Sequence, residues 1–178
     1  PPAEAYRQLL RIYQQEKDWL KAIEMAKKSQ SKQGQDLSLI IAQFYCELAE
    51  QAPSNADSNQ LIKQALSHDR DCVRASLLSA NMNMQTGAYR KAIKSLLKIE
   101  QQNHRYIPEA LPLLLSCHQQ TNTLKQFRIY LTELLSRQPD MTSARLILVD
   151  IIQLEDSVES AHDYLSKQLH QHPSVEGL

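Results

Sequence analysis

Glycine, cysteine and surplus charge are all scarce in this chain of 178 residues. Its three glycines form neither G-x-G-x-x-G nor G-x-x-x-x-G-K-[ST], so it lacks the known loops that cradle phosphate groups. Twenty basic and twenty acidic side chains cancel, which leaves no excess positive charge to attract nucleic acid or anionic lipid. No apolar run reaches the roughly 18 residues of a candidate membrane-spanning helix. We therefore expect no binding of nucleotides or nucleic acid and no direct membrane contact by this segment.

Metal and disulfide sites have little support either. The three cysteines, Cys46, Cys72 and Cys117, include no C-x-x-C pair, which fits neither a disulfide framework nor a zinc knuckle and indicates a reducing compartment. His170 and His172 stand two residues apart, and that spacing on a helix sends two side chains to different faces. We interpret the six histidines as surface polar residues and expect no metal ligand and no cofactor in this chain.

No residue pattern points to an active site. No serine lies in a G-x-S-x-G motif, and the neighbours Cys117 and His118 point about 100° apart on a helix. A thiol nucleophile needs its activating base within hydrogen-bond reach. Glu47 and Glu50 share a helical face, but without a closed pocket we interpret them as a solvated pair of carboxylates. The sequence predicts a protein that is not an enzyme.

The residues that the chain does have favour helices. Hydrophobic residues make up 42% and charged residues 22%, which is enough apolar material to bury a core. Gln, Leu, Ala, Ser and Lys are common, and helices tolerate most of these residues well. An all-α fold is the first expectation.

A repeat of about 34 residues organises the helices. Tyr6, Leu10 and Tyr13, followed by Trp19 and Ala22, are typical of one tetratricopeptide unit, in which a second helix opens with an aromatic residue. The turn signature recurs 70 positions later as Gly87-x-Tyr89-x-x-Ala92, and two prolines at expected helix ends stand 34 positions apart, at 139 and 173. Further units follow from Ala42-x-x-Tyr45-Cys46-x-x-Ala49 with Leu61-Ile62-x-x-Ala65, from Leu111 to Leu134, and from Leu148 to Leu165.

These units predict about five antiparallel helix hairpins stacked into a right-handed tetratricopeptide superhelix, since a single hairpin cannot bury its apolar face alone. Residues 1–178 then form one array. Its approximate units are residues 3–35, 36–70, 71–105, 106–140 and 141–174.

Several residues have predicted structural roles in this array. Small or aromatic packing residues are Ala22, Ala65, Ala92, Ala161, Trp19 and Cys46. Helix caps are expected at Asp18, at Asp156 with Glu159, at Gly34 and at Gly87. Pro108 suits a first helical turn, and Pro112 must lie in that same turn or kink the helix.

First helices should line a concave groove, and its inward-facing polar residues are the candidate protein-binding residues. Arg7 and Arg11 stand four apart and give the groove a basic end, whereas Glu47 and Glu50 give it an acidic stretch. The full candidate set is Arg7, Arg11, Gln43, Glu47, Glu50, Arg74, Asn81, Gln119 and Asp150.

Six strings of residues go beyond the general repeat pattern. The most specific is Phe44-Tyr45-Cys46-Glu47-Leu48-Ala49. The others are Leu9-Leu10-x-Ile12-Tyr13-Gln14, Trp19-x-Lys21-Ala22-Ile23, Gly87-x-Tyr89-x-Lys91-Ala92, Asp150-Ile151-Ile152 and Gln168-Leu169-x-x-His172-Pro173. In the same order and at nearly the same spacing, these strings resemble the lipopolysaccharide assembly protein B family of Gram-negative bacteria, also called LapB or YciM. The resemblance covers nearly the whole chain and is to the central repeat segment of that family.

The resemblance implies an adaptor that presents the LpxC deacetylase to the FtsH membrane protease and so limits lipopolysaccharide synthesis. It also implies a longer parent protein on the cytoplasmic side of the inner membrane, with an N-terminal membrane anchor and a C-terminal rubredoxin-like module that binds zinc or iron through two Cys-x-x-Cys pairs. This chain would be the repeat segment alone, without anchor or metal.

Other binding roles stay open. The chain is alternatively a chaperone-like clamp for a carboxylate terminus, although no asparagine stands where such a clamp needs one beside Arg7 and Arg11. A further alternative is the regulatory repeat segment of an enzyme whose catalytic domain is absent. Another is a scaffold that self-associates, for instance as a homodimer.

Overall fold

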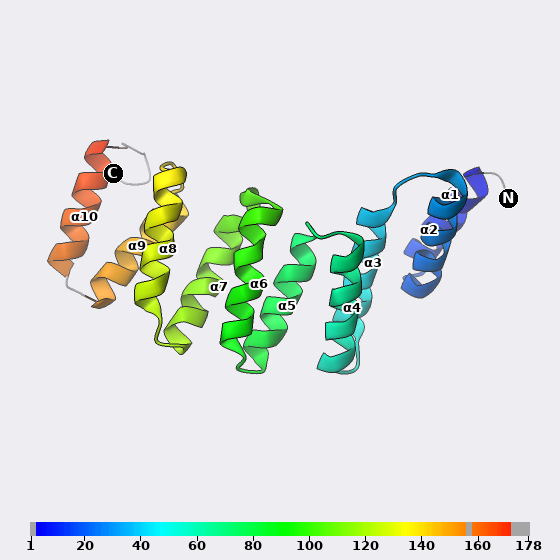
Figure 1. Cartoon of the computed structure of the whole chain (residues 1–178), viewed down its shortest axis with the longest axis horizontal. Coiled ribbons are helices and arrows are strands. Elements are labelled where there is room, and N and C mark those ends of the chain that lie inside the picture. Colours follow the sequence, from blue (N-terminus) through cyan, green and yellow to red (C-terminus); the bar gives the residue numbers. More distant parts are fainter. Residues whose placement is uncertain (1–2, 156–157, 172–178) are drawn as a thin grey trace. The chain divides into compact units, whose positions relative to one another are not determined.

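Residues 3–155 and 158–171 are described by a computed structural model, and over them the chain forms ten α-helices and one short 3-10 helix (Figure 1). The helices are α1 (Ala3–Gln15), α2 (Trp19–Gln33), α3 (Ser38–Gln51), α4 (Asn55–His68), α5 (Val73–Gln85), α6 (Tyr89–Gln102), the 3-10 helix η1 (His104–Tyr106), α7 (Ile107–Gln120), α8 (Leu124–Arg137), α9 (Thr142–Glu155) and α10 (Val158–Gln171). The all-α prediction is confirmed.

The helices belong to two compact units, Pro1–His104 and Arg105–Leu178. In the first unit α1 packs on α2, α2 on α3, α3 on both α4 and α5, and α5 on α6. In the second unit α7 packs on α8 and α9, α8 packs on α9, and α9 packs on α10. Helices adjacent in sequence therefore pair as hairpins, as the repeat predicts. The five residue ranges given above for the units stay a prediction.

Small residues allow the helices of each unit to approach closely. Ala22, Ala65 and Ala92 are fully buried, which confirms their predicted packing role; the side chain of Ala161 lies outside the described residues. Trp19 packs in the core of the first unit, with its ring 5.7 Å from that of Phe44. The large apolar residues of the second unit, Phe127, Leu131, Leu134, Leu148 and Ile151, are fully buried as well.

Three of the turns within hairpins have the same hydrogen bonds at a spacing set by the repeat. Lys17, Gly87 and Asn122 adopt positive φ angles of 55°, 72° and 52°, and positions 87 and 122 stand 35 apart. The next residue in each turn donates its backbone N–H five residues back, from Asp18 to Tyr13, Ala88 to Asn83 and Thr123 to His118, over 2.7–2.9 Å. This Schellman geometry satisfies carbonyls at the helix end and reverses the chain. The predicted role of Gly87 is thereby confirmed.

Most of the predicted helix boundaries are also confirmed. Asp18 caps α2 by accepting the backbone N–H of Lys21 at 3.2 Å, and Gly34 ends that helix with φ 65°. Pro108 lies at the start of α7, where its missing N–H costs no helical hydrogen bond. Pro112 lies further inside α7, beyond its first turn. The predicted cap at Asp156 falls outside the described residues.

The interpretation of the histidines as surface residues is wrong for His118, which is 7% exposed. Its ring stacks on Phe127 with centroids 4.9 Å apart, and its Nδ1 lies 3.1 Å from the carbonyl oxygen and 2.7 Å from Oγ1 of Thr123. The positive-φ turn at Asn122 folds Thr123 back over the end of α7, which brings these partners to the ring. His118 is therefore a core residue that also stabilises a turn.

Replacing Gly87 with alanine tests the role of the positive-φ turns. A Cβ built there has no atom within 4 Å, so the only penalty is the left-handed backbone. We expect the free energy of unfolding to fall by about 1–2 kcal/mol. Urea denaturation measures the change, and Lys17→Gly serves as the matched control because it should stabilise the same kind of turn. A Gly87→Ala variant as stable as the parent protein would contradict this account.

Burial of His118 predicts that stability depends on pH. Desolvation lowers the pKa of His118 below its ordinary value of 6.5, although the hydrogen bond to Thr123 opposes the shift. Burial, with Lys27 nearby, also lowers the pKa of His68. Between the pKa of the folded state and that of the unfolded state, the unfolded chain binds more protons than the folded chain. The free energy of unfolding that the neutral histidines contribute is therefore fully present above about pH 6.5, and it is lost as the pH falls toward their pKa in the folded state.

We expect the midpoint of thermal unfolding to decrease between about pH 7.5 and about pH 5.5. The His118→Gln variant keeps an N–H donor but cannot titrate, so its midpoint should decrease less over the same interval. An identical pH dependence in the two proteins would show that His118 does not contribute.

Candidate functional site

Three of the predicted binding residues form one ion-pair network between α3 and α5. The guanidinium of Arg74 donates to Glu47 over 2.7 Å through one terminal nitrogen and to Glu50 over 2.8 Å through the other. Its Nε also donates to Glu50 over 3.3 Å. Burial acts to lower the pKa of Arg74, but its bonds to Glu50 and Glu47 raise it, and the net direction is upward. The two carboxylates, which stay partly exposed, are therefore both ion-paired with Arg74, and the three side chains together keep one net negative charge.

Two further candidates lie beside this network. Gln43, exposed on α3, directs its side-chain nitrogen at the sulfur of Cys72 over 3.6 Å. Asn81, exposed on α5, lines a shallow cleft of about 230 Å³ together with Glu50 and Met82. The structure thus brings five of the nine candidates together along α3 and α5.

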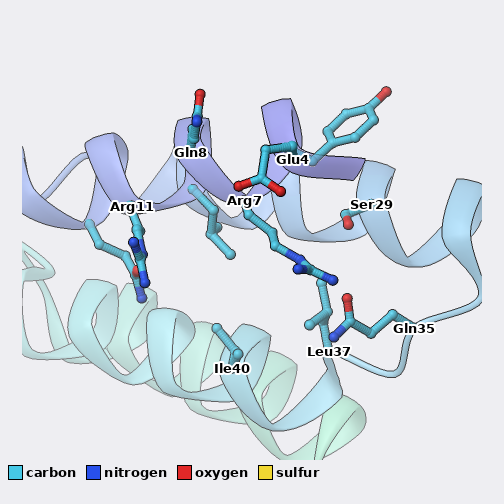
Figure 2. A pocket seen from close by; sticks show the side chains of 11 residues that line it. Glu4, Arg7, Gln8, Arg11, Ser29, Gln35, Leu37 and Ile40 are labelled. Atoms are coloured by element: carbon cyan, nitrogen blue, oxygen red, sulfur yellow. The ribbon is translucent and has the colours of Figure 1, made fainter. Parts of the chain in front are cut away.

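Arg7 and Arg11 lie apart from that group, in a cleft of about 370 Å³ between α1 and α3. Figure 2 shows both guanidinium groups pointing from α1 toward α3, where Ile40 faces them. Within the described residues neither arginine has an ion-pair partner, although Glu4 also lines the cleft. Apolar side chains complete the wall: Tyr6, Leu10, Leu37 and Ile40. This arrangement suits a segment that carries both acidic and aliphatic side chains.

The remaining two candidates belong to the second unit. Gln119 is exposed near the end of α7 and lines a surface depression formed with the turn at Asn122 and the start of α8. Asp150 is exposed on α9.

Sequence reasoning missed the apolar half of the cleft between α1 and α3. Ile40 is 37% exposed, and its neighbour Leu39 is 66% exposed. The available signal was the run Leu39-Ile40-Ile41 at the start of α3, because only part of such a run can face the core of an amphipathic helix. The predicted groove residues are all polar or charged, so they include none of these apolar side chains.

The donor set for the metal module of the resembled family is not present in this chain. The module needs two Cys-x-x-Cys pairs, whereas the three cysteines here stand alone in the sequence. Among the described residues no group of three or more His, Cys, Asp or Glu side chains lies close enough to hold a metal ion. Nor does any described helix combine the length and the apolar run needed to cross a bilayer.

Comparison with known proteins finds close sequence relatives. The chain is 34% identical over 175 residues to lipopolysaccharide assembly protein B of Escherichia coli strain K12, a match that covers 96% of the chain. The resemblance to lipopolysaccharide assembly protein B is confirmed. The protein of that name from Haemophilus influenzae is also 34% identical, over 173 residues and 96% of the chain. The chain spans 44% and 43% of the lengths of these two relatives. No family model matches.

Solved structures support the fold. A crystal structure of MamA aligns with a TM-score of 0.54 at 16% identity, covering 95% of this chain and 91% of that one. A tetratricopeptide repeat protein from Parabacteroides merdae aligns with a TM-score of 0.55 at 14% identity, covering 98% of this chain and 70% of the other. The predicted tetratricopeptide fold class is thus confirmed.

Removing the cation of the α3–α5 network leaves Glu47 and Glu50 to repel each other. The three side chains are 29–43% exposed, so we expect Arg74→Ala to lower the free energy of unfolding by only about 0.5–1 kcal/mol. The loss should shrink at high salt, where charges are screened. Urea titrations at low and high salt measure this loss of stability. Lys28→Ala is the control: it removes a more exposed ion pair on α2 and should have a smaller effect. A loss that does not depend on salt would point to packing instead.

Proposed function

We propose that this chain is a non-catalytic adaptor segment that acts in lipopolysaccharide synthesis by linking the LpxC deacetylase to the FtsH protease. The observation that carries the proposal is the 34% identity to lipopolysaccharide assembly protein B over 96% of the chain. As an adaptor it would raise the effective concentration of one partner near the other without chemistry of its own.

Two features of the structure favour binding of a protein segment. The cleft between α1 and α3 offers two guanidinium groups above an apolar wall, so it can hold an acidic and aliphatic segment by bidentate hydrogen bonds and apolar contact. Along α3 and α5, the paired charges of Arg74, Glu47 and Glu50 lie beside exposed amides on Gln43 and Asn81. That second surface can donate and accept hydrogen bonds, and its three charged side chains leave one net negative charge.

The proposal extends to the parent protein. It places this segment on the cytoplasmic side of the bacterial inner membrane, in a longer chain with a membrane anchor and a rubredoxin-like metal module. LpxC and FtsH are the proposed partners because the resemblance to lipopolysaccharide assembly protein B implies them.

A capture experiment with purified proteins tests the proposal. The chain is immobilised and exposed to LpxC and to the cytoplasmic region of FtsH, with Arg7→Glu/Arg11→Glu beside the parent protein. We expect capture of at least one partner, weakened about tenfold or more by the charge reversal, because each arginine would lose a charge-assisted contact. The matched control is Arg90→Glu/Lys94→Glu, which reverses two exposed charges that also stand four apart, on α6.

Capture that both double variants weaken equally would indicate a general charge effect and would contradict a site at the cleft. Failure to capture either protein would contradict the adaptor role of this segment. Light scattering on the same preparations measures the mass of the free chain, and a stable dimer without partner capture would favour the self-associating scaffold.

A further inference from the structure

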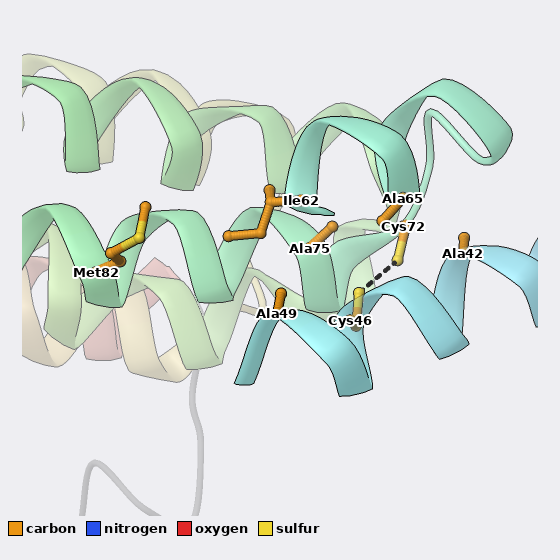
Figure 3. Close-up of a cluster of buried hydrophobic side chains, with 8 residues drawn as sticks. All are labelled: Ala42, Cys46, Ala49, Ile62, Ala65, Cys72, Ala75 and Met82. Atoms are coloured by element: carbon orange, nitrogen blue, oxygen red, sulfur yellow. Dashed lines mark hydrogen bonds between the residues drawn. The ribbon is translucent and has the colours of Figure 1, made fainter. Parts of the chain in front are cut away.

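Two cysteines that the proposed function does not use lie against each other in the core of the first unit. Cys46 is in α3, and Cys72 is the residue that precedes α5, 26 positions later. Their sulfur atoms are 3.8 Å apart, and both residues are buried, with exposures of 0% and 2% (Figure 3). The surrounding cluster contains alanines of both helices together with Ile62 and Met82.

The two sulfurs have different environments. Cys72 stands at the N-terminus of a 13-residue helix, where the helix dipole favours a negative charge. Its sulfur accepts hydrogen bonds from the backbone N–H of Ala75 and the side-chain nitrogen of Gln43, and it lies within hydrogen-bond distance of the Cys46 sulfur, where either thiol can be the donor. Cys46, in the middle of α3, has its thiol directed at Cys72 and does not stand at a helix N-terminus.

These contacts shift the pKa values of the two thiols in opposite directions. The hydrogen bond from Cys46 is the largest cause that lowers the pKa of Cys72, to about 7, against the opposing effects of burial and Asp69. The bond to Cys72 raises the pKa of Cys46, and burial and Glu50 act in the same direction. Arg74 lowers both. Cys72, at a helix N-terminus with the Ala75 N–H and the Gln43 side chain directed at its sulfur, is therefore better placed than Cys46 to carry the thiolate and act as the nucleophile of the pair.

We propose that Cys46 and Cys72 are an oxidation site at which a peroxide produces a disulfide between α3 and the start of α5. The Cys72 thiolate attacks the O–O bond of the peroxide, which gives a sulfenic acid on Cys72 and releases hydroxide. The sulfur of Cys46 then displaces that hydroxyl group, which leaves as water with the proton of Cys46 and the S–S bond forms. Overall two thiols lose two electrons and two protons, and hydrogen peroxide becomes two water molecules.

The two sulfurs are near enough to be joined by a modest movement. A disulfide has an S–S length of about 2.05 Å, so the sulfurs must approach by roughly 2 Å from their 3.8 Å separation. The turn that leads to Cys72 carries two exposed residues, Arg70 and Asp71. Since Cys72 itself is buried, a small peroxide would reach it through a local opening of this turn.

The cross-link would tie together parts of two hairpins. It closes a loop that contains all of α4 and fixes the start of α5 to α3. The unfolded chain loses freedom when such a loop is closed, so the oxidised protein should unfold at a higher temperature. Oxidation also changes the sulfur of Cys72 to which Gln43 donates a hydrogen bond. Gln43 lies beside the Arg74 network, so oxidation would alter a polar contact next to that network.

The chain supplies its own control. Cys117, in α7, is also buried, but desolvation alone raises its pKa and no other cysteine of the described residues lies beside it. A buried thiol without a lowered pKa or a neighbouring sulfur should resist oxidation.

The test is oxidation of the purified native chain with dilute hydrogen peroxide. We expect the intact mass to fall by about 2 Da, the loss of two hydrogens. Peptide mapping should find Cys46 joined to Cys72 and Cys117 as a free thiol, and dithiothreitol should restore the original mass and unfolding temperature. The Cys117→Ser variant should behave like the parent protein, whereas Cys46→Ser and Cys72→Ser should not lose 2 Da.

A sulfenic-acid probe, dimedone, checks the order of events. It should label Cys72 in the Cys46→Ser variant and leave Cys46 unlabelled in the Cys72→Ser variant. The same oxidation in denaturing urea should scramble the pairing among all three cysteines, which ties the specificity to the folded chain. Native mapping that finds no Cys46–Cys72 bond, or finds Cys117 oxidised as fast as Cys72, would overturn the proposal, and this result does not depend on whether any variant folds.

Discussion

The close approach of helices at alanine is the contact on which the rest of this structure depends. Ala22, Ala42, Ala65 and Ala75 have no exposed surface, and each lies in a core cluster that residues of more than one helix form. A hairpin of two short helices leaves an apolar face in water unless a neighbour covers it, so burial at these positions joins successive hairpins into a unit.

Much of this architecture was predictable from the sequence because the repeat combines local and periodic signals. The turn at Gly87 was predictable, since glycine readily adopts positive φ. The equivalent turns at Lys17 and Asn122 were not predictable, because these two positions hold no glycine. The spacing of the repeat alone does not indicate a positive φ there. His118 was misjudged for a related reason: its burial depends on Thr123, which reaches the ring only through the turn at Asn122.

The candidate site was less predictable than the fold. Helical periodicity places Glu47, Glu50 and Arg74 on first helices, but their pairing requires the register between α3 and α5, over 24 to 27 residues of sequence. The same register brings Cys46 to Cys72, a contact that their spacing in the sequence gives no means of predicting. Composition and pattern specify which faces meet, whereas the axial offset between helices is decided by the shapes of the packed side chains.

Some charged side chains of the first unit are already ion-paired and others are not. This difference decides where a charged partner would gain most binding free energy. Along α3 and α5, Arg74 already holds two carboxylates, so an incoming charge would have to compete with existing ion pairs and gain little. At the cleft between α1 and α3, Arg7 and Arg11 have no such partner among the described residues, and apolar side chains lie beside them. A carboxylate bound there makes new hydrogen bonds without breaking old ones. On the proposed binding role, an acidic segment would therefore gain more at the arginines of α1 than along α3 and α5, where the network keeps one net negative charge.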